Sequence, residues 1–270
     1  METMIPPKAH WDPDADFSRT SFFIRRMDTS GYIKPSEAPA AMLPLIGFIY
    51  VSSGEALVDV DGTLFLCQPG QLLLIPQKAP FSVRYYRDVE GYTGGFAPSF
   101  ISDAKPLRFL TSPLHQGFWF DQGAFAGMLF NMLYASFGKG DMVFVEKGLD
   151  LLLSLLRPEH SAAIPPAVNL FLESVFDPGR LPGSIASYAV EAGISENYLS
   201  RLVRKSTGRS VGAWIDIVRI QRAKRLLSST SLPVIDVAVA VGVDDQSYFS
   251  RLFKKETGMT PSSFRKKMQG

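Results

Sequence analysis

A short motif that occurs twice, fifty positions apart, constrains the fold of this chain more than any other feature of its sequence. Residues 198–202 read YLSRL, residues 248–252 read YFSRL, and a Thr-Gly pair follows each copy at the same distance. On the N-terminal side the matching Ala and Gly residues are forty-nine positions apart, so the second copy has one extra residue in its turn. The two stretches are therefore predicted to be copies of one supersecondary unit.

Each copy contains the parts of a helix-turn-helix unit. A first helix with an inward-facing alanine is expected to end at a glycine, which adopts the left-handed conformation found at helix ends. An aliphatic residue then fills the core, and a Ser or Asp side chain caps the second helix. In that order the residues are Ala189, Gly193, Ile194 and Ser195 in the first copy, and Ala238, Gly242, Val243 and Asp244 in the second.

The second helix of each copy is predicted to separate cations from apolar side chains, because successive residues advance by about 100°. One face holds polar and cationic residues, namely Asn197, Ser200, Arg201 and Arg204 in the first copy, and Ser247, Ser250, Arg251 and Lys254 in the second. The opposite face holds Tyr198, Leu199, Leu202 and Val203, and in the second copy Tyr248, Phe249, Leu252 and Phe253. An ordinary solvated helix face would also be charged, but it would mix both signs. A face of cations and small hydrogen-bonding groups suits the major groove of DNA.

Between the copies, residues 214–227 contain no Gly or Pro and keep an apolar stripe through Trp214, Val218 and Leu226. This pattern predicts one continuous helix. A rigid helix would fix the separation of the two units, so that they enter successive major grooves about 34 Å apart.

These residues resemble the AraC/XylS family of bacterial transcription regulators over roughly 168–268. The most specific stretch is 242–255, which reads GVDDQSYFSRLFKK and continues to Gly258 and the PSSFR of residues 261–265. Arg219, Ala223, Leu226 and Leu227 of the linking helix also fit the family. The chain departs from the family pattern at Val203, Val211 and Val243, which are expected to be core positions.

The resemblance implies which residues read bases. They are Asn197, Ser200 and Arg201 in the first unit, and Gln246, Ser247, Tyr248 and Arg251 in the second. Arg204 and Lys254 complete the predicted DNA-binding set from the cationic faces. The family also implies an N-terminal cupin-like barrel that binds an effector, helices that form a homodimer, and RNA polymerase as a partner.

The N-terminal part has a different pattern, with short apolar runs separated by turn residues from about Phe22 to Phe100. Asp61-Gly62 between two such runs is a strong hairpin signal, since a tight primed turn needs positive φ. Helical spacing follows in 123–137 and 143–156, and a proline-rich linker at 157–166. We expect an α+β fold, with an antiparallel cupin-like barrel plus helices in 1–160 and an all-α DNA-binding domain in 167–270.

Charge is divided between these parts, because residues 1–164 carry 13 Lys and Arg against 17 Asp and Glu, whereas residues 165–270 carry 15 against 9. A basic C-terminal part suggests a polyanionic partner. The single cysteine, Cys67, excludes a disulfide framework. The sequence shows neither a signal peptide nor a membrane span, so a bacterial cytoplasmic protein is expected, at the nucleoid when DNA is bound.

The N-terminal part is expected to bind an effector rather than to catalyse a reaction, with no catalytic residues, metal or cofactor. Its histidines, His10, His115 and His160, are too dispersed to form a metal site of the cupin type. Residues 81–86 alternate in character, so Ser82, Arg84 and Tyr86 would share a face, either towards a ligand or towards solvent. Arg84 and Tyr86 are the effector-binding candidates.

The leading hypothesis is a sequence-specific DNA-binding regulator, expected to be an activator, controlled by a small-molecule effector. One alternative is a cupin-type enzyme fused to a DNA-targeting helical domain. A protein-interaction module that uses basic helices is another, but it makes the repeated cationic faces a coincidence.

Overall fold

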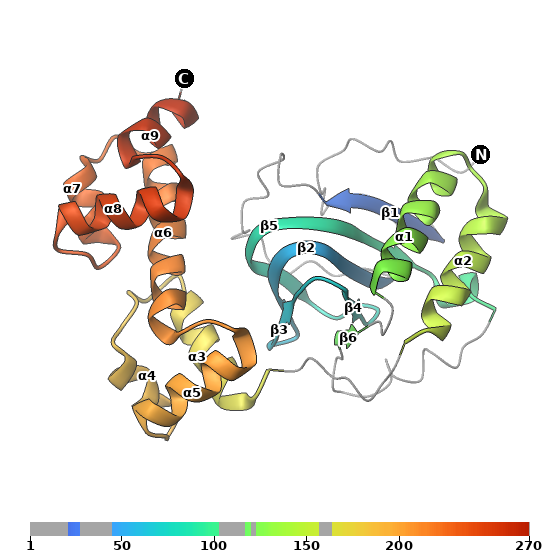
Figure 1. Cartoon of the computed structure of the whole chain (residues 1–270), viewed down its shortest axis with the longest axis horizontal. Helices are drawn as coiled ribbons and strands as arrows, with labels where there is room; N and C mark the ends of the chain where they lie inside the picture. The colour runs from blue at the N-terminus through green and yellow to red at the C-terminus, as the bar shows by residue number, and fades with distance from the viewer. Residues whose placement is uncertain (1–20, 28–44, 103–116, 120–122, 157–163, 270) are drawn as a thin grey trace. The chain divides into compact units, whose positions relative to one another are not determined.

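The computed structural model describes residues 21–27, 45–102, 117–119, 123–156 and 164–269 (Figure 1). The chain divides into two compact units, Met1–Ile164 and Pro165–Gly270. The first is built on an antiparallel sheet with a helix pair, and the second is helical. The expected α+β class is confirmed at this level.

The sheet of the N-terminal unit has the strand order β1-β5-β2-β4-β6, with β3 paired to β2. Its strands are β1 (Phe22–Met27), β2 (Ile46–Val60), β3 (Thr63–Cys67), β4 (Gln71–Ile75), β5 (Phe81–Phe96) and β6 (Gly117–Trp119), and the short helix η1 (Pro98–Phe100) follows β5. All pairings are antiparallel. The long strands β2 and β5 curve strongly along their length (Figure 1).

The predicted hairpin is present between β2 and β3. Asp61 and Gly62 have φ values of 50° and 78°, as a primed turn requires. The Ser53-Gly54 pair, which also separates two apolar runs, lies inside β2 rather than in a turn between strands. There the pairing with β5 shifts register between Val51 and Glu55, so a bulge bends the strand without ending it.

One face of the sheet packs against two helices, α1 (Gly123–Gly138) and α2 (Met142–Ser154), which lie side by side (Figure 1). The Phe130 ring of α1 stacks on Tyr50 of β2 with centroids 4.3 Å apart. The other face forms a second apolar cluster that includes Ile49, Val58 and Phe65. Both faces of the sheet are therefore buried.

The C-terminal unit contains seven helices within residues 164–269. They are α3 (Pro166–Phe176), α4 (Ile185–Glu191), α5 (Glu196–Thr207), α6 (Val211–Ser229), α7 (Val234–Ala240), α8 (Gln246–Thr257) and α9 (Pro261–Gln269). The predicted continuous helix over 214–227 lies within α6, and α6 contacts α3, α5, α7, α8 and α9. It is thus the common support of both halves of this unit.

Two equivalent threonines, Thr207 at the end of α5 and Thr257 at the end of α8, form the same hydrogen bond to the preceding turn of their helix. Thr207 Oγ1 donates to the carbonyl of Val203 at 2.8 Å, and Thr257 Oγ1 donates to that of Phe253 at 2.7 Å. Thr207 also accepts a hydrogen bond of 2.9 Å from the indole nitrogen of Trp214, which is fully buried. Fifty residues after Trp214 stands Phe264, whose ring lies 5.5 Å from that of Phe253. The same packing position is therefore filled by an indole in one half and a phenyl ring in the other.

Across the helices that the structure describes, none combines the length and apolar character needed to cross a membrane.

Candidate nucleic-acid interface

Two equivalent helices, α5 and α8, carry all nine residues predicted to bind DNA. Each follows a short helix, α4 or α7, that ends before a glycine in the left-handed region, Gly193 with φ 65° or Gly242 with φ 77°. Both glycines occupy the positions that the sequence predicted. Val243 is buried as predicted, whereas Ile194 is half-buried.

Side-chain caps begin both helices. Ser195 Oγ accepts a hydrogen bond of 3.3 Å from the backbone nitrogen of Tyr198, as predicted. In the second copy the predicted cap, Asp244, is wrong, because Asp245 accepts from the backbone nitrogens of Ser247 at 2.7 Å and Tyr248 at 3.0 Å. The extra residue in this turn moves the cap by one position. The backbone N–H groups of Tyr248 and Ser247, with a smaller effect from the charge of Arg251, lower the pKa of Asp245, so it caps as a carboxylate.

The predicted DNA-binding residues are open to solvent. Those that are exposed are Asn197, Arg201, Arg204, Gln246, Ser247, Tyr248, Arg251 and Lys254, and Ser200 is half-buried. Leu199, Val203, Phe249 and Phe253 are buried on the opposite face. The structure therefore brings the predicted residues of each copy together on one helix. The departures from the family pattern, Val203, Val211 and Val243, are buried as expected.

Two tyrosines do not follow the helical-wheel assignment. Tyr198 and Tyr248 were placed on the core face, but their side chains are 46% and 42% exposed. Both lie in the first turn of their helix, where the core below is already filled by the residue that follows. For Tyr248 the family resemblance had indicated exposure to DNA. For Tyr198 neither the helical wheel nor the resemblance indicates exposure, although its equivalence to Tyr248 does.

Polar contacts hold the turn between α3 and α4 against α6. Arg222 donates from Nη1 to the carbonyl of Arg180 at 2.5 Å and from Nη2 to that of Asp177 at 2.6 Å. Because Arg222 sits on the same helix that supports α7 and α8, these bonds tie the first copy to the common support.

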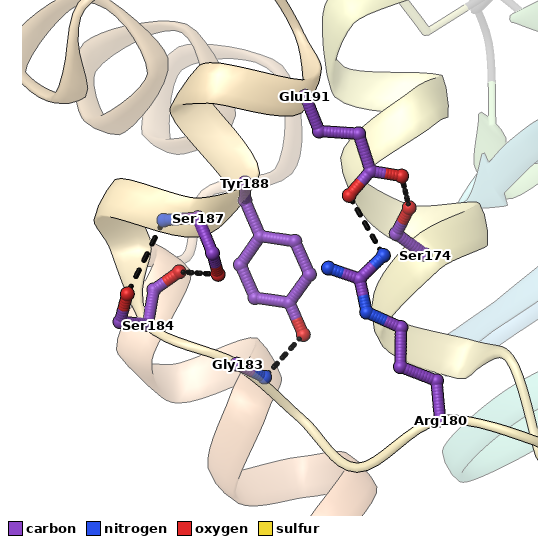
Figure 2. A network of polar contacts seen from close by, with 7 residues as sticks. All are labelled: Ser174, Arg180, Gly183, Ser184, Ser187, Tyr188 and Glu191. Carbon is purple, nitrogen blue, oxygen red and sulfur yellow. Dashed lines mark hydrogen bonds and ion pairs between the residues drawn. The ribbon is translucent and has the colours of Figure 1, made fainter.

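A polar network fastens α4 to the turn that precedes it (Figure 2). Arg180 pairs with Glu191 at 2.8 Å, Ser174 donates a hydrogen bond to the same carboxylate, and the hydroxyl of Tyr188 accepts one of 2.9 Å from the backbone of Gly183. The hydrogen bonds from Ser174 and Arg180 lower the pKa of Glu191. Forty-nine residues later the positions of Ser174, Tyr188 and Glu191 are taken by Ala223, Val237 and Ala240. At these three positions the second copy therefore has apolar side chains where the first has hydrogen bonds and an ion pair.

The predicted shared face of Ser82, Arg84 and Tyr86 in the N-terminal unit is wrong for Tyr86. The β2–β5 register shifts between Leu57 and Val58, so Arg84 falls in a bulge. Its Nε and Nη2 donate to Asp59 Oδ2 at 3.1 Å and 2.5 Å, and Asp59 pairs with Ser82. Tyr86 instead packs on the opposite face, against the cluster that contains Val58.

The three histidines, His10, His115 and His160, lie outside the described residues. Within the ranges that the structure describes, His, Cys, Asp and Glu side chains nowhere gather in a group of three or more that could hold a metal ion.

Comparison with known proteins decides the family. Residues 188–267 match a family model described as a helix-turn-helix domain. The arabinose operon regulatory protein of Salmonella typhimurium is 32% identical over 229 residues, which cover 78% of this chain and 80% of that protein. The chain belongs to the AraC/XylS family of transcription regulators.

Other members of the AraC/XylS family are also similar to this chain. The transcriptional activator RhaR of Escherichia coli strain K12 is 36% identical over 86 residues, 32% of this chain and 30% of that protein. A solved structure of a probable AraC family transcriptional regulator from Rhodopseudomonas palustris is 25% identical, covering 39% of this chain and all of that one with a TM-score of 0.37. The relatives named here are regulators, which favours a regulator over the alternative of a cupin-type enzyme.

Proposed function

We propose that this AraC/XylS regulator binds specific duplex DNA through two helix-turn-helix units, α4–α5 and α7–α8. The observation that carries the proposal is the recurrence of one arrangement on both reading helices, each capped, buried on one side and cationic on the other. An acceptor-rich major groove is the surface that such a face complements.

Within this proposal the nine residues divide by chemistry. Arg201 and Arg251, in the middle of each exposed face, would read guanine through paired donors, while Asn197, Ser200, Gln246, Ser247 and Tyr248 contact neighbouring base edges. Arg204 and Lys254 lie one turn further along, where they would hold phosphates. Phosphate contacts orient the protein on DNA without reading sequence.

Affinity for DNA should fall steeply with salt. Each phosphate contact releases condensed counterions and contributes about −0.9 to the slope of log K against log salt concentration. Fluorescence anisotropy with a duplex selected by the full chain from a random library, against a scrambled duplex, measures both slope and selectivity. Equal affinity for the two duplexes at physiological salt would contradict the proposed function.

We also propose that the N-terminal unit is a cupin-like barrel that responds to a small-molecule effector. Its antiparallel sheet with two buried faces supports this reading. Arg84 is the stronger candidate contact, because it offers N–H donors, and its partner Asp59 offers acceptor oxygens, to a hydroxylated ligand. Tyr86 lies on the opposite face of the sheet, so it would contact an effector only at a different place from Arg84. A thermal-shift screen of metabolites against the full chain tests this, and no stabilising compound would count against it.

A homodimer is proposed to form through α1 and α2. Met128 and Met132, one turn apart on α1, are 51% and 42% exposed, and Val143 and Leu151 of α2 are also exposed. Large apolar side chains of this kind favour pairing with a second copy. Sedimentation at tens of micromolar is expected to give the dimer mass, and a purely monomeric species would contradict it.

Activation is the proposed mode of regulation, with RNA polymerase as the partner that the family implies. The site of action would be the bacterial cytoplasm, at the nucleoid, where the DNA target lies. A promoter-reporter assay in which expression falls on removal of this chain would support activation, and a rise would indicate repression.

A further inference from the structure

Tyr198 is the large apolar side chain on the exposed side of α5. Its neighbours Leu199 and Val203 are fully buried, so the core below the helix is complete without it. Tyr198 is 46% exposed, beside polar residues proposed to read bases. Its aromatic ring is therefore available for a contact outside the core.

Among the described residues, Arg201 lies close to this ring. Arg201 follows three residues later, which places both side chains on adjacent positions of the helix surface. The guanidinium carbon of Arg201 lies 5.9 Å from the centroid of the Tyr198 ring. A cation near an aromatic face is attracted by the ring, and the contact restricts the rotamers of a long side chain.

The surroundings of the equivalent arginine, Arg251, differ in the second copy. There the cap is the carboxylate of Asp245 rather than a serine hydroxyl. Hydrogen bonds from the backbone N–H groups of Tyr248 and Ser247 lower the pKa of Asp245, and the charge of Arg251 makes the smallest contribution to this. The first copy has no acidic cap at Ser195, and the Tyr198 ring is the group that lies against Arg201.

We propose that Tyr198 determines specificity on α5, because its ring positions Arg201 towards a guanine and its exposed edge contacts the 5-methyl group of a thymine in the neighbouring base pair. The thymine methyl is the apolar group that the major groove presents, and an aromatic edge matches it. This inference rests on the proposed function of α5 as a reading helix. It adds a residue that neither the helical-wheel assignment nor the positions carried over from the family include.

The test uses the full chain and a duplex that it selects from a random library. The base pair read by Arg201 is located first, as the position where Arg201→Ala relaxes selectivity. Neighbouring thymines are then replaced singly by deoxyuridine, which removes only the methyl group. The wild type and Tyr198→Phe should both lose about three- to tenfold in affinity at one of these replacements. Tyr198→Ala should bind the thymine duplex about tenfold more weakly and should no longer distinguish thymine from deoxyuridine.

A double-mutant comparison tests separately whether Tyr198 positions Arg201. The effects of Tyr198→Ala and Arg201→Ala should be less than additive, because the first variant already disorders the side chain that the second removes. Thermal unfolding checks that the variants are folded. Should Tyr198→Ala lower the melting temperature, Tyr198→Gln, which also lacks a ring but favours helix, provides the same comparison.

Several outcomes would overturn the inference. They are a selected site with no thymine beside the base pair of Arg201, unchanged thymine discrimination in Tyr198→Ala, and strictly additive effects of the two variants. If Arg201→Ala and Arg251→Ala both leave sequence selectivity intact, the proposed function fails as well. If only the Tyr198 variants are without effect, the proposal that α5 and α8 read DNA is retained and the inference about Tyr198 alone is rejected.

Discussion

Replacing Trp214 by alanine is expected to lower the free energy of unfolding of the C-terminal unit by about 3–5 kcal/mol, the usual cost of emptying a large aromatic site in a core. Trp214 is fully buried at the start of α6, and its ring lies 6.0 Å from that of Phe176 on α3. It also donates the hydrogen bond that Thr207 accepts at the end of α5. Urea unfolding followed by circular dichroism of the helices measures the change.

The second copy supplies the matched control for this variant. Phe264 occupies the position equivalent to Trp214, so Trp214→Phe keeps an aromatic ring that the repeated architecture already accepts. It should lose roughly 1 kcal/mol for the hydrogen bond to Thr207, plus a smaller packing loss. Equal destabilisation by alanine and phenylalanine would show that the ring does not hold α3, α5 and α6 together.

Arg251→Ala is expected to weaken binding to the selected duplex by about 1–3 kcal/mol, which is roughly 5- to 150-fold in Kd. Arg251 is exposed in the middle of α8, and its backbone is held by the neighbouring buried residues Leu252 and Phe253. Its loss should relax selectivity at one base pair and leave binding to a scrambled duplex nearly unchanged. Anisotropy titrations against duplexes altered at single positions measure both effects.

Lys254→Ala is the control for this prediction, because it removes a cation from the same face one turn further along. If Lys254 holds a phosphate, affinity for all duplexes should fall alike and the salt slope should decrease by about 1. A loss from Arg251→Ala that is equal for selected and scrambled duplexes would mean that Arg251 acts only as a charge.

The features predicted from sequence were those that depend on local patterns. The glycine turns at Gly193 and Gly242 and the continuous helix α6 follow from residue preferences over short windows, and repetition doubled the evidence for the reading helices. The Asp61-Gly62 hairpin is similarly local. The sequence also indicated the exposed cationic faces, because 3.6-residue periodicity alone separates Arg201 from Leu199.

Other features depend on details that periodicity does not contain. One extra residue in a turn moved the cap to Asp245, and a bulge put Tyr86 on the face opposite Arg84. Tyr198 is exposed although a helical wheel places it with the core, because wheels ignore that the first turn projects beyond the packed interior. The network around Glu191 joins positions up to seventeen residues apart and could not be read from either segment alone.

That network makes the anchoring of α4 sensitive to acid and to dissolved ions in a way that the anchoring of α7 is not. Because the pKa of Glu191 is lowered in the folded unit, the stability it adds is complete above the unfolded pKa of a glutamate and is lost as the pH falls through the folded value. Salt screens the partly exposed Arg180–Glu191 ion pair. Exposed ion pairs stabilise a fold by about 0.2–1 kcal/mol, so the loss of stability at high salt is modest. The equivalent alanine and valine positions of the second unit carry no charge to protonate or screen. In acid or at high salt the anchoring of α4 is therefore expected to weaken while the apolar anchoring of α7 is unchanged. In the second unit the acid-sensitive point is instead the start of α8, where the carboxylate of Asp245, whose pKa is also lowered, caps the helix.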